Sequence, residues 1–275
     1  MPNLELVPKR DLSSFRKIAL GTWRTAYDPS VYGTMTVRMD EAMRYVAAFR
    51  QKRQRKLTVS HLLAKSVAMA LKEVPDANAI LRWSRIYLRK RIGVFFQVVM
   101  SDEAETDLSG ATLYDVERKT LCEIHDEFVS KVEAVRQRKD PALEKTRRTF
   151  LSIPYFALSC VLRAISFFSY TLNLDLRSLG IPQDPFGSVM ITNIGSLGLD
   201  SAYVPLVPYS RVPILVAAGE VKREPVVTGD RIEVAQLMRL GVTFDHRIID
   251  GFHAAKMAKV VRAWMEAPFE HFDSL

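Results

Sequence analysis

The distribution of apolar and polar residues along the chain predicts both helices and strands. In some segments apolar residues recur at helical spacing, and in others they alternate or form short runs rich in β-branched residues. The predicted helices are 11–26, 40–54, 57–74, 115–138 and 251–267. The predicted strands are 32–39, 79–82, 86–89, 92–100, 188–193, 213–221, 224–227 and 231–243, with a hairpin turn at 228–230. Both kinds of element therefore contribute to the fold.

Three details refine these predictions. Strand 92–100 is nearly continuously apolar, which is typical of a central strand covered on both faces. The acidic stretch 101–110 that follows is expected to be a loop. Thr58 or Ser60 is expected to cap the helix that starts there, and Pro75 to end it.

The segment 150–171 is unusually apolar. Its only charged residue is Arg163, and its length is close to the ~20 residues that span a bilayer. Pro154, the central arginine and several serines argue against a spanning helix. We expect one or two short helices packed in a core or at a subunit contact, inside an atypical apolar insertion at 139–185. A membrane contact through 150–171 is the less favoured alternative.

Length and composition are those of one globular domain over residues 1–275. A chain of 275 residues, 48% hydrophobic and 25% charged, is large enough to bury one sizeable core. Cys122 and Cys160 are far apart and lack metal-ligand spacing, so neither a disulfide scaffold nor a metal site is expected. The N-terminus shows no signal-peptide pattern. We therefore expect a cytoplasmic protein.

The charge balance is basic, with a formal net charge of +8. Basic residues cluster at 50–56, 82–91 and 136–148, where they could meet nucleic acid, anionic lipid or a phosphate-bearing ligand. Solvated helix ends and strand edges are the plainer explanation for any one cluster. No nucleic-acid-binding module accompanies them, so we expect no nucleic acid partner.

The most distinctive stretch lies near the end of the chain, where a predicted strand meets a predicted helix. It reads Asp245-His246-Arg247-Ile248-Ile249-Asp250-Gly251. On structural grounds alone, an aspartate would cap the helix, the glycine would relax the backbone and the histidine would be incidental.

The whole string suggests more. Asp-His-Arg-x-x-Asp-Gly resembles the active-site signature of the dihydrolipoamide acyltransferase catalytic domains of 2-oxoacid dehydrogenase complexes, within the chloramphenicol-acetyltransferase-like superfamily. Further stretches resemble that family in the same order along the chain: 12–19, 58–66, 74–79, 186–198, 212–219 and 266–268.

The resemblance implies a two-layer α/β sandwich, a mixed β-sheet covered by helices, assembled as a homotrimer or a larger particle. It also implies an active site in a channel between neighbouring subunits, with coenzyme A as a substrate. His246 would then be the general base for a thiol, since imidazole titrates near neutral pH. The Thr192 hydroxyl, where the family usually has serine, would stabilise the oxyanion from the neighbouring subunit.

Supporting roles follow from the same resemblance. Asp250 would pair with an arginine of the opening helix, here Arg16, and Asn193 and Gly251 would shape the two loops. Each has a plainer interpretation as well: Thr192 as a β-branched strand residue, Asn193 as a turn former, and Arg16 as a surface cation.

The chain also departs from the family pattern. The usual Gly-Leu-x-x-Pro-Val after the strand that ends near Met100 is replaced by an acidic stretch. The sequence contains no lipoyl domain, no peripheral-subunit-binding domain and no Ala/Pro linker. A lipoyl group, if used, is therefore expected on another protein. Two interpretations stay open: a coenzyme A-dependent acyltransferase, and a catalytically weak core or scaffold protein of a similar assembly.

Overall fold

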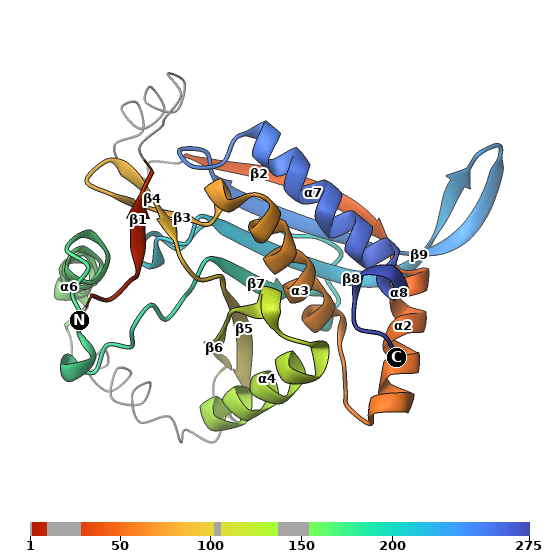
Figure 1. The fold of residues 1–275 in the computed structure, drawn as a ribbon, viewed down its shortest axis with the longest axis horizontal. Coiled ribbons are helices and arrows are strands. Elements are labelled where there is room, and N and C mark those ends of the chain that lie inside the picture. Colours follow the sequence, from red (N-terminus) through yellow and green to blue (C-terminus); the bar gives the residue numbers. More distant parts are fainter. Residues whose placement is uncertain (1, 10–28, 102–105, 137–153) are drawn as a thin grey trace.

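A six-stranded mixed sheet forms the centre of the molecule (Figure 1). The structure, a computed structural model, describes residues 2–9, 29–101, 106–136 and 154–275. The strands, in their spatial order, are β2 (Ser30–Arg38), β9 (Arg231–Asp245), β8 (Ile214–Thr228), β7 (Val189–Asn193), β5 (Gly93–Ser101) and β6 (Thr106–Tyr114). β7 runs parallel to both of its neighbours, and every other pair is antiparallel.

Helices cover one face of this sheet. They are α2 (Asp40–Arg53), α3 (Val59–Glu73), α4 (Leu121–Arg136), α7 (Gly251–Glu266) and α8 (Pro268–His271). In Figure 1, α7, α3 and α4 lie next to one another in front of the strands. The main core fills the space between them, with Tyr45, Phe49 and Leu62 fully buried. The predicted arrangement of a mixed sheet covered by helices is therefore confirmed.

The opposite face of the sheet is covered by irregular chain. Met190, Val212 and Leu215 form a second buried cluster there, and Phe95 of β5 packs against it. Side chains from both faces of β5 are thus enclosed, as its apolar sequence predicted. The strand is paired on both sides, but it lies next to the edge of the sheet rather than at its centre.

A smaller unit lies beside the main sheet, at the left of Figure 1. A three-stranded sheet contains β1 (Leu6–Pro8), β4 (Arg85–Arg89) and β3 (Ala79–Arg82) in that order. Next to it run α6 (Tyr155–Ser166) and the π-helix η3 (Phe167–Thr171), which contacts β3. Short 3-10 turns complete the described elements: η1 (Pro75–Ala77), η2 (Val116–Arg118), η4 (Arg177–Leu179), η5 (Gly195–Leu197) and η6 (Pro208–Ser210).

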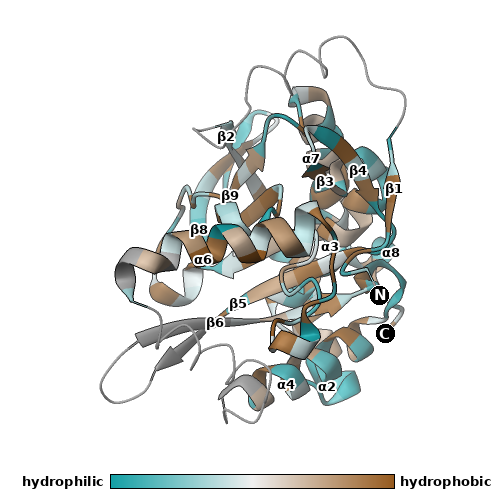
Figure 2. Cartoon of the chain, turned by 90° about the vertical axis from the view of Figure 1, so that its left-hand side faces the viewer, coloured by the Kyte–Doolittle hydropathy of each residue, from teal (hydrophilic) through white to brown (hydrophobic). Residues whose placement is uncertain are grey.

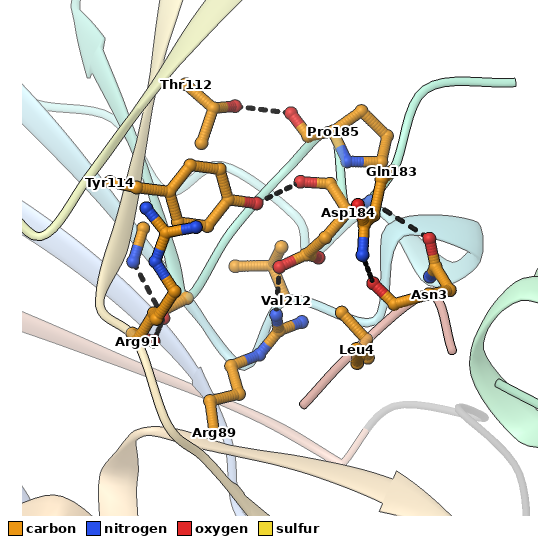
Figure 3. A network of polar contacts seen from close by, with 12 residues as sticks. Asn3, Leu4, Arg89, Arg91, Thr112, Tyr114, Gln183, Asp184, Pro185 and Val212 are labelled. Carbon is orange, nitrogen blue, oxygen red and sulfur yellow. Dashed lines mark hydrogen bonds and ion pairs between the residues drawn. The ribbon is translucent and has the colours of Figure 1, made fainter. Parts of the chain in front are cut away.

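A buried ion pair joins the small unit to the main sheet (Figure 3). The guanidinium of Arg89 donates to the carboxylate of Asp184 at 2.5 Å, and both side chains are almost completely buried. The backbone N–H of Asp184 donates to the side chain of Asn3 at 3.1 Å, and Tyr114 of β6 donates to the Asp184 carbonyl. Segments from four parts of the sequence are therefore held at one point.

Several predicted boundaries were wrong. The predicted loop 101–110 is in part strand β6, which starts at Thr106 and pairs along all of β5. Its buried residues Ala111 and Leu113 alternate with less buried ones, but the acidic residues before them masked that pattern. The predicted strands 213–221 and 224–227 are one strand, β8, with a register shift between Ala218 and Val221. The predicted helix 115–138 begins only at Leu121.

The apolar segment forms a short helix and a π-helix, as the prediction of one or two short helices allowed. The described side chains of α6 are not enclosed in a core within one chain, since Cys160, Arg163 and Ala164 are exposed. A role at a subunit contact stays a prediction. Among the described residues, no helix combines the length and the apolar character that crossing a bilayer requires.

Candidate active site

His246 directly follows the last residue of β9, and its backbone anchors it there. The His246 N–H donates to the carbonyl of Pro29 just before β2, at 2.8 Å. Its ring Nδ1 lies 2.8 Å from the carbonyl oxygen of Ile249. Because a carbonyl can only accept, the proton must be on Nδ1, and the lone pair of the neutral ring is then on Nε2. The local fold thus selects the tautomer in which Nε2 can accept a proton.

The turn that carries His246 is rigidly built. Asp245 is buried and its carboxylate receives three hydrogen bonds from the Arg247 guanidinium, at 2.9, 3.1 and 2.6 Å. The backbone N–H groups of Ile248 and Ile249 donate to the Asp245 carbonyl at 3.0 and 2.9 Å. The Ile249 carbonyl is therefore held in place to orient the imidazole. This orienting group is a backbone atom, so no residue type in the sequence signals it.

Asp250 is the N-cap of α7. Its carboxylate accepts the backbone N–H groups of Phe252 and His253, both at 3.0 Å, and lies 2.7 Å from Nδ1 of His253. These contacts are those of a helix cap, the plainer of the two roles considered for this residue. The predicted partner Arg16 lies outside the described residues. The contact with His253 was not anticipated.

Thr192 and Asn193 end strand β7. Thr192 is half-buried, and its hydroxyl makes no hydrogen bond to the described residues. The Asn193 side chain accepts the backbone N–H of Ser196 at 3.2 Å and donates to the hydroxyl of Ser60 on α3 at 3.2 Å. Asn193 therefore holds the turn after β7 against α3, a contact that only the tertiary structure reveals.

His246 and Thr192 stand at opposite ends of the sheet within one chain. β7 is parallel to β8, and β8 is antiparallel to β9, so the carboxyl ends of β7 and β9 point in opposite directions. Thr192 is level with Ala217, and Ala217 with Gly241, which precedes His246 by five residues. At ~3.4 Å per residue and ~4.8 Å per strand, the two residues are roughly 20 Å apart. The two groups do not form one site inside a single chain.

Gly251 begins α7 without a local need for glycine. A Cβ placed on it would meet nothing within 4 Å, and its φ is not positive. The predicted role in shaping the loop therefore has no steric basis within one chain.

An apolar cavity of about 280 Å³ lies between α7, α3 and strands β2, β8 and β9. Phe244 and Ile249, on either side of the His246 turn, line it, together with small residues such as Ala254 and Ala258. None of the described residues that line this cavity is charged. Among the described residues, no cluster of side chains has the composition of a metal site.

The mixed sheet covered by helices on one face is the fold of the chloramphenicol-acetyltransferase-like class. Chloramphenicol acetyltransferase itself superposes with a TM-score of 0.53 over 95% of this chain and all of its own, at 13% identity. The chain belongs to the family of 2-oxoacid dehydrogenase acyltransferase catalytic domains, which it matches over residues 11–151 and 183–272. The interval between these ranges contains α6 and the π-helix.

Acyltransferase components of 2-oxoacid dehydrogenase complexes are among the proteins similar to this chain. Over 78% of this chain, the acetyltransferase component of the pyruvate dehydrogenase complex of Acholeplasma laidlawii is 25% identical, and the match spans 31% of that protein. The succinyltransferase component of the 2-oxoglutarate dehydrogenase complex of Staphylococcus saprophyticus is 22% identical over the same share, spanning 40% of its length. The chain thus spans less than half the length of these relatives.

Solved structures show the same fold. The dihydrolipoamide acetyltransferase of Azotobacter vinelandii superposes with a TM-score of 0.66 over 97% of this chain and 93% of its own, at 21% identity. The roles of a serine, a histidine and an asparagine in its catalytic mechanism have been investigated. The cubic core of a pyruvate dehydrogenase multienzyme complex superposes equally well, at 20% identity, over 96% of this chain and 99% of its own.

Proposed function

We propose that this domain moves an acyl group between coenzyme A and a second thiol, with dihydrolipoamide as that thiol. The observation that carries the proposal is the His246 imidazole, whose Nδ1 is bound to the Ile249 carbonyl so that Nε2 can accept a proton. Its position at the end of β9, inside the range that matches the acyltransferase family, supports the same reaction. A neutral imidazole is the side chain best suited to deprotonate a thiol near pH 7.

The reaction needs one base and one oxyanion donor. Nε2 of His246 takes the thiol proton as sulfur attacks the carbonyl carbon of the acyl thioester. The carbonyl oxygen of the tetrahedral intermediate carries the negative charge and accepts a hydrogen bond from the Thr192 hydroxyl. The intermediate then collapses as the carbon–sulfur bond of the original thioester breaks, and the departing thiolate takes the proton back from His246. No acyl-enzyme is required.

The relative from Azotobacter vinelandii supports this assignment of roles. In its numbering the asparagine stands four residues after the histidine, as Asp250 stands after His246. Its serine precedes the histidine by 52 positions, and Thr192 precedes His246 by a similar 54 (246 − 192). Threonine keeps the hydroxyl that a serine would supply. In this proposal Asp250 acts by fixing the start of α7 and the turn before it, and not by proton transfer.

We also propose that the domain works as a trimer or a larger assembly of trimers. Because Thr192 and His246 end strands at opposite ends of one sheet, a complete site requires two copies of the chain. The likeness to a cubic multienzyme core supports a closed, symmetric assembly. The lipoyl group would arrive on a separate domain, and the protein would act in the cytoplasm.

The deciding experiment is acetyl transfer between acetyl-coenzyme A and free dihydrolipoamide. We expect the wild type to turn over and His246→Ala to lose roughly 100-fold to 10,000-fold of kcat, because the base is gone. His125→Gln, on α4 and outside the proposed site, is the matched control and should keep full activity. Sedimentation should show that all three proteins assemble alike. An assembled wild type with no transfer to dihydrolipoamide would refute the proposal and favour the scaffold interpretation.

A further inference from the structure

Three aromatic side chains are exposed together on the small unit beside the main sheet. Trp83 is 60% exposed, Phe167 39% and Phe168 44%. Their rings form a chain of edge contacts, with centroids 5.9 Å apart for Trp83 and Phe167 and 5.7 Å apart for Phe167 and Phe168. Leu172 and Leu174, which follow the π-helix, are exposed as well, and their backbone N–H groups donate to the carbonyls of Phe167 and Phe168. Exposed apolar side chains that gather in this way mark an interaction site.

The position of Trp83 is conformationally unfavourable. Trp83 and Ser84 form the two-residue turn between β3 and β4, with φ of +49° and +57°. Such a turn is normally occupied by asparagine, aspartate or glycine, because a side chain with a Cβ is strained at positive φ. A bulky tryptophan at this position destabilises the fold, and its side chain gains little burial in return. The presence of tryptophan at the tip of the hairpin therefore indicates that its exposed side chain binds a partner.

Three arginines flank these aromatic residues along β3, β4 and α6 and have no carboxylate partner among the described residues. Arg82 and Arg85 are a cross-strand pair directly beside the turn. The Arg82 guanidinium donates only to the Thr171 carbonyl, at 3.0 Å, and stacks on the Tyr87 ring. Arg163 is exposed on α6, one helical turn before Phe167. Residues 79–91 contain no acidic residue, and neither do residues 154–172. The surface is therefore cationic as well as aromatic.

The supporting elements hold this surface outward. Tyr170 of the π-helix is buried against Leu4 and Ile80, and the Arg211 guanidinium donates to the Ser166 hydroxyl at 2.9 Å and to the Leu81 carbonyl at 3.1 Å. These contacts fix one side of the α6–π-helix unit to the small sheet. Figure 2 shows α6, largely hydrophobic in colour, lying across the face that looks toward the viewer. The interval 152–182, between the two ranges that match the family, contains this unit.

We propose that the Trp83 patch, defined as Trp83, Phe167 and Phe168 with Arg82, Arg85 and Arg163, docks the protein onto an anionic membrane surface. Aromatic side chains prefer the headgroup layer of a bilayer, and arginines beside them bind lipid phosphates. A nearly uncharged surface helix next to cationic side chains fits an interfacial contact rather than a spanning one. The patch would bring the domain to a membrane, independently of the acyl transfer proposed for His246.

Vesicle flotation tests this proposal with the intact protein. We expect the wild type to float with vesicles of equal parts phosphatidylcholine and phosphatidylglycerol, and not with phosphatidylcholine alone. Trp83→Asn should weaken the partition at least roughly tenfold, since binding scales with the apolar area inserted. This variant should fold well, because asparagine tolerates positive φ. Arg85→Gln and Arg163→Gln should each weaken it about fivefold, and high salt should weaken it further.

Two matched controls distinguish binding through the Trp83 patch from nonspecific electrostatic and hydrophobic binding. Arg118→Gln removes an exposed charge on η2, and Ile232→Asn removes an exposed apolar side chain on the β8–β9 hairpin. Both should float like the wild type. The proposal is overturned if Trp83→Asn floats normally or if neutral vesicles bind equally well. It is also overturned if the wild type does not float with the anionic vesicles; a change of assembly state or of single-stranded RNA binding in Trp83→Asn would then identify the patch as a subunit contact or an RNA site. Acyl transfer by Trp83→Asn should be unchanged, so failure here leaves the His246 assignment intact.

Discussion

At the scale of single residues, His61 shows how a histidine can serve structure rather than chemistry. It occupies the third position of α3, and its Nδ1 accepts the backbone N–H of Thr58 at 3.0 Å. The side chain is 2% exposed. Burial, together with the nearby His125 and Arg50, lowers the pKa of His61 from 6.5 to about 3. The ring therefore stays neutral in the folded protein, where it completes a reciprocal cap of the kind usually made with glutamate or glutamine.

This lowered pKa predicts acid destabilisation in a defined window. Between pH 6.5 and about 3 the unfolded chain binds a proton on His61 that the folded chain does not. The contribution of neutral His61 to the free energy of unfolding is thus fully present above pH 6.5. It is lost as the pH falls toward 3, at up to about 1.4 kcal/mol per pH unit. Urea unfolding of wild type and His61→Gln at pH 7.5 and 4.5 would measure it. Glutamine can still cap the helix but cannot titrate. The His61→Gln variant should therefore lose less stability on acidification than the wild type. Equal losses would rule out His61 as the source.

At the scale of elements, the turn after β7 depends on two glycines of neighbouring strands. The segment after η5 crosses the sheet so closely that a Cβ on Gly219 would overlap the Asp200 carbonyl, and one on Gly241 the Ala202 carbonyl. The N–H of Glu220, at the register shift in β8, donates to the Leu199 carbonyl at 3.0 Å. The chain that continues from Thr192 is therefore held by backbone contact with β8 and β9.

We predict that Gly241→Ala destabilises the fold by about 1–3 kcal/mol, because backbone atoms must move to accept the methyl group. Gly33→Ala is the matched control on the paired strand β2, where the nearest atom to a new Cβ is 4.0 Å away. It should be neutral or stabilising by up to about 1 kcal/mol. Urea unfolding of the two variants gives the comparison, and acyl transfer should fall only in Gly241→Ala. Similar stabilities for both variants would contradict the close approach.

At the scale of the whole molecule, the positions of Thr192 and His246 make activity a property of neighbouring copies. Each end of one sheet carries half of the proposed site. Thr192→Ala and His246→Ala should each be poorly active alone. Random mixing of the two variants in one assembly should restore about a quarter of wild-type activity, because that fraction of shared sites receives both intact groups.

This complementation can be measured by co-expression or joint refolding, with sedimentation to confirm assembly. Thr192→Ser, which keeps the hydroxyl, serves as the control for Thr192→Ala and should remain active. If the mixture is no more active than the separate variants, the site is not shared between copies. A stable, active wild-type monomer would also show that the site is not shared between copies.

Much of this organisation was predictable from local patterns. Helical spacing located α2, α3 and α7 nearly to the residue, because each buries one apolar stripe against the sheet. The string from Asp245 to Gly251 located the turn that carries His246, because a strand end, a turn and a helix cap all follow from short-range residue preferences. β6 was missed for the opposite reason. It is an edge strand defined by pairing with β5, and acidic residues at its start hid its alternation.

The fold class, the turn that carries His246 and the resemblance that suggests acyl transfer could all be inferred from the amino-acid sequence, since these depend on neighbours in the chain. How those parts combine follows from the tertiary structure alone. Strand order separated Thr192 from His246, the Ile249 carbonyl selected the histidine tautomer, and the β3–β4 turn brought Trp83 beside Phe167. Each of these depends on contacts between residues far apart in the chain or on backbone atoms, which leave no signature in residue types.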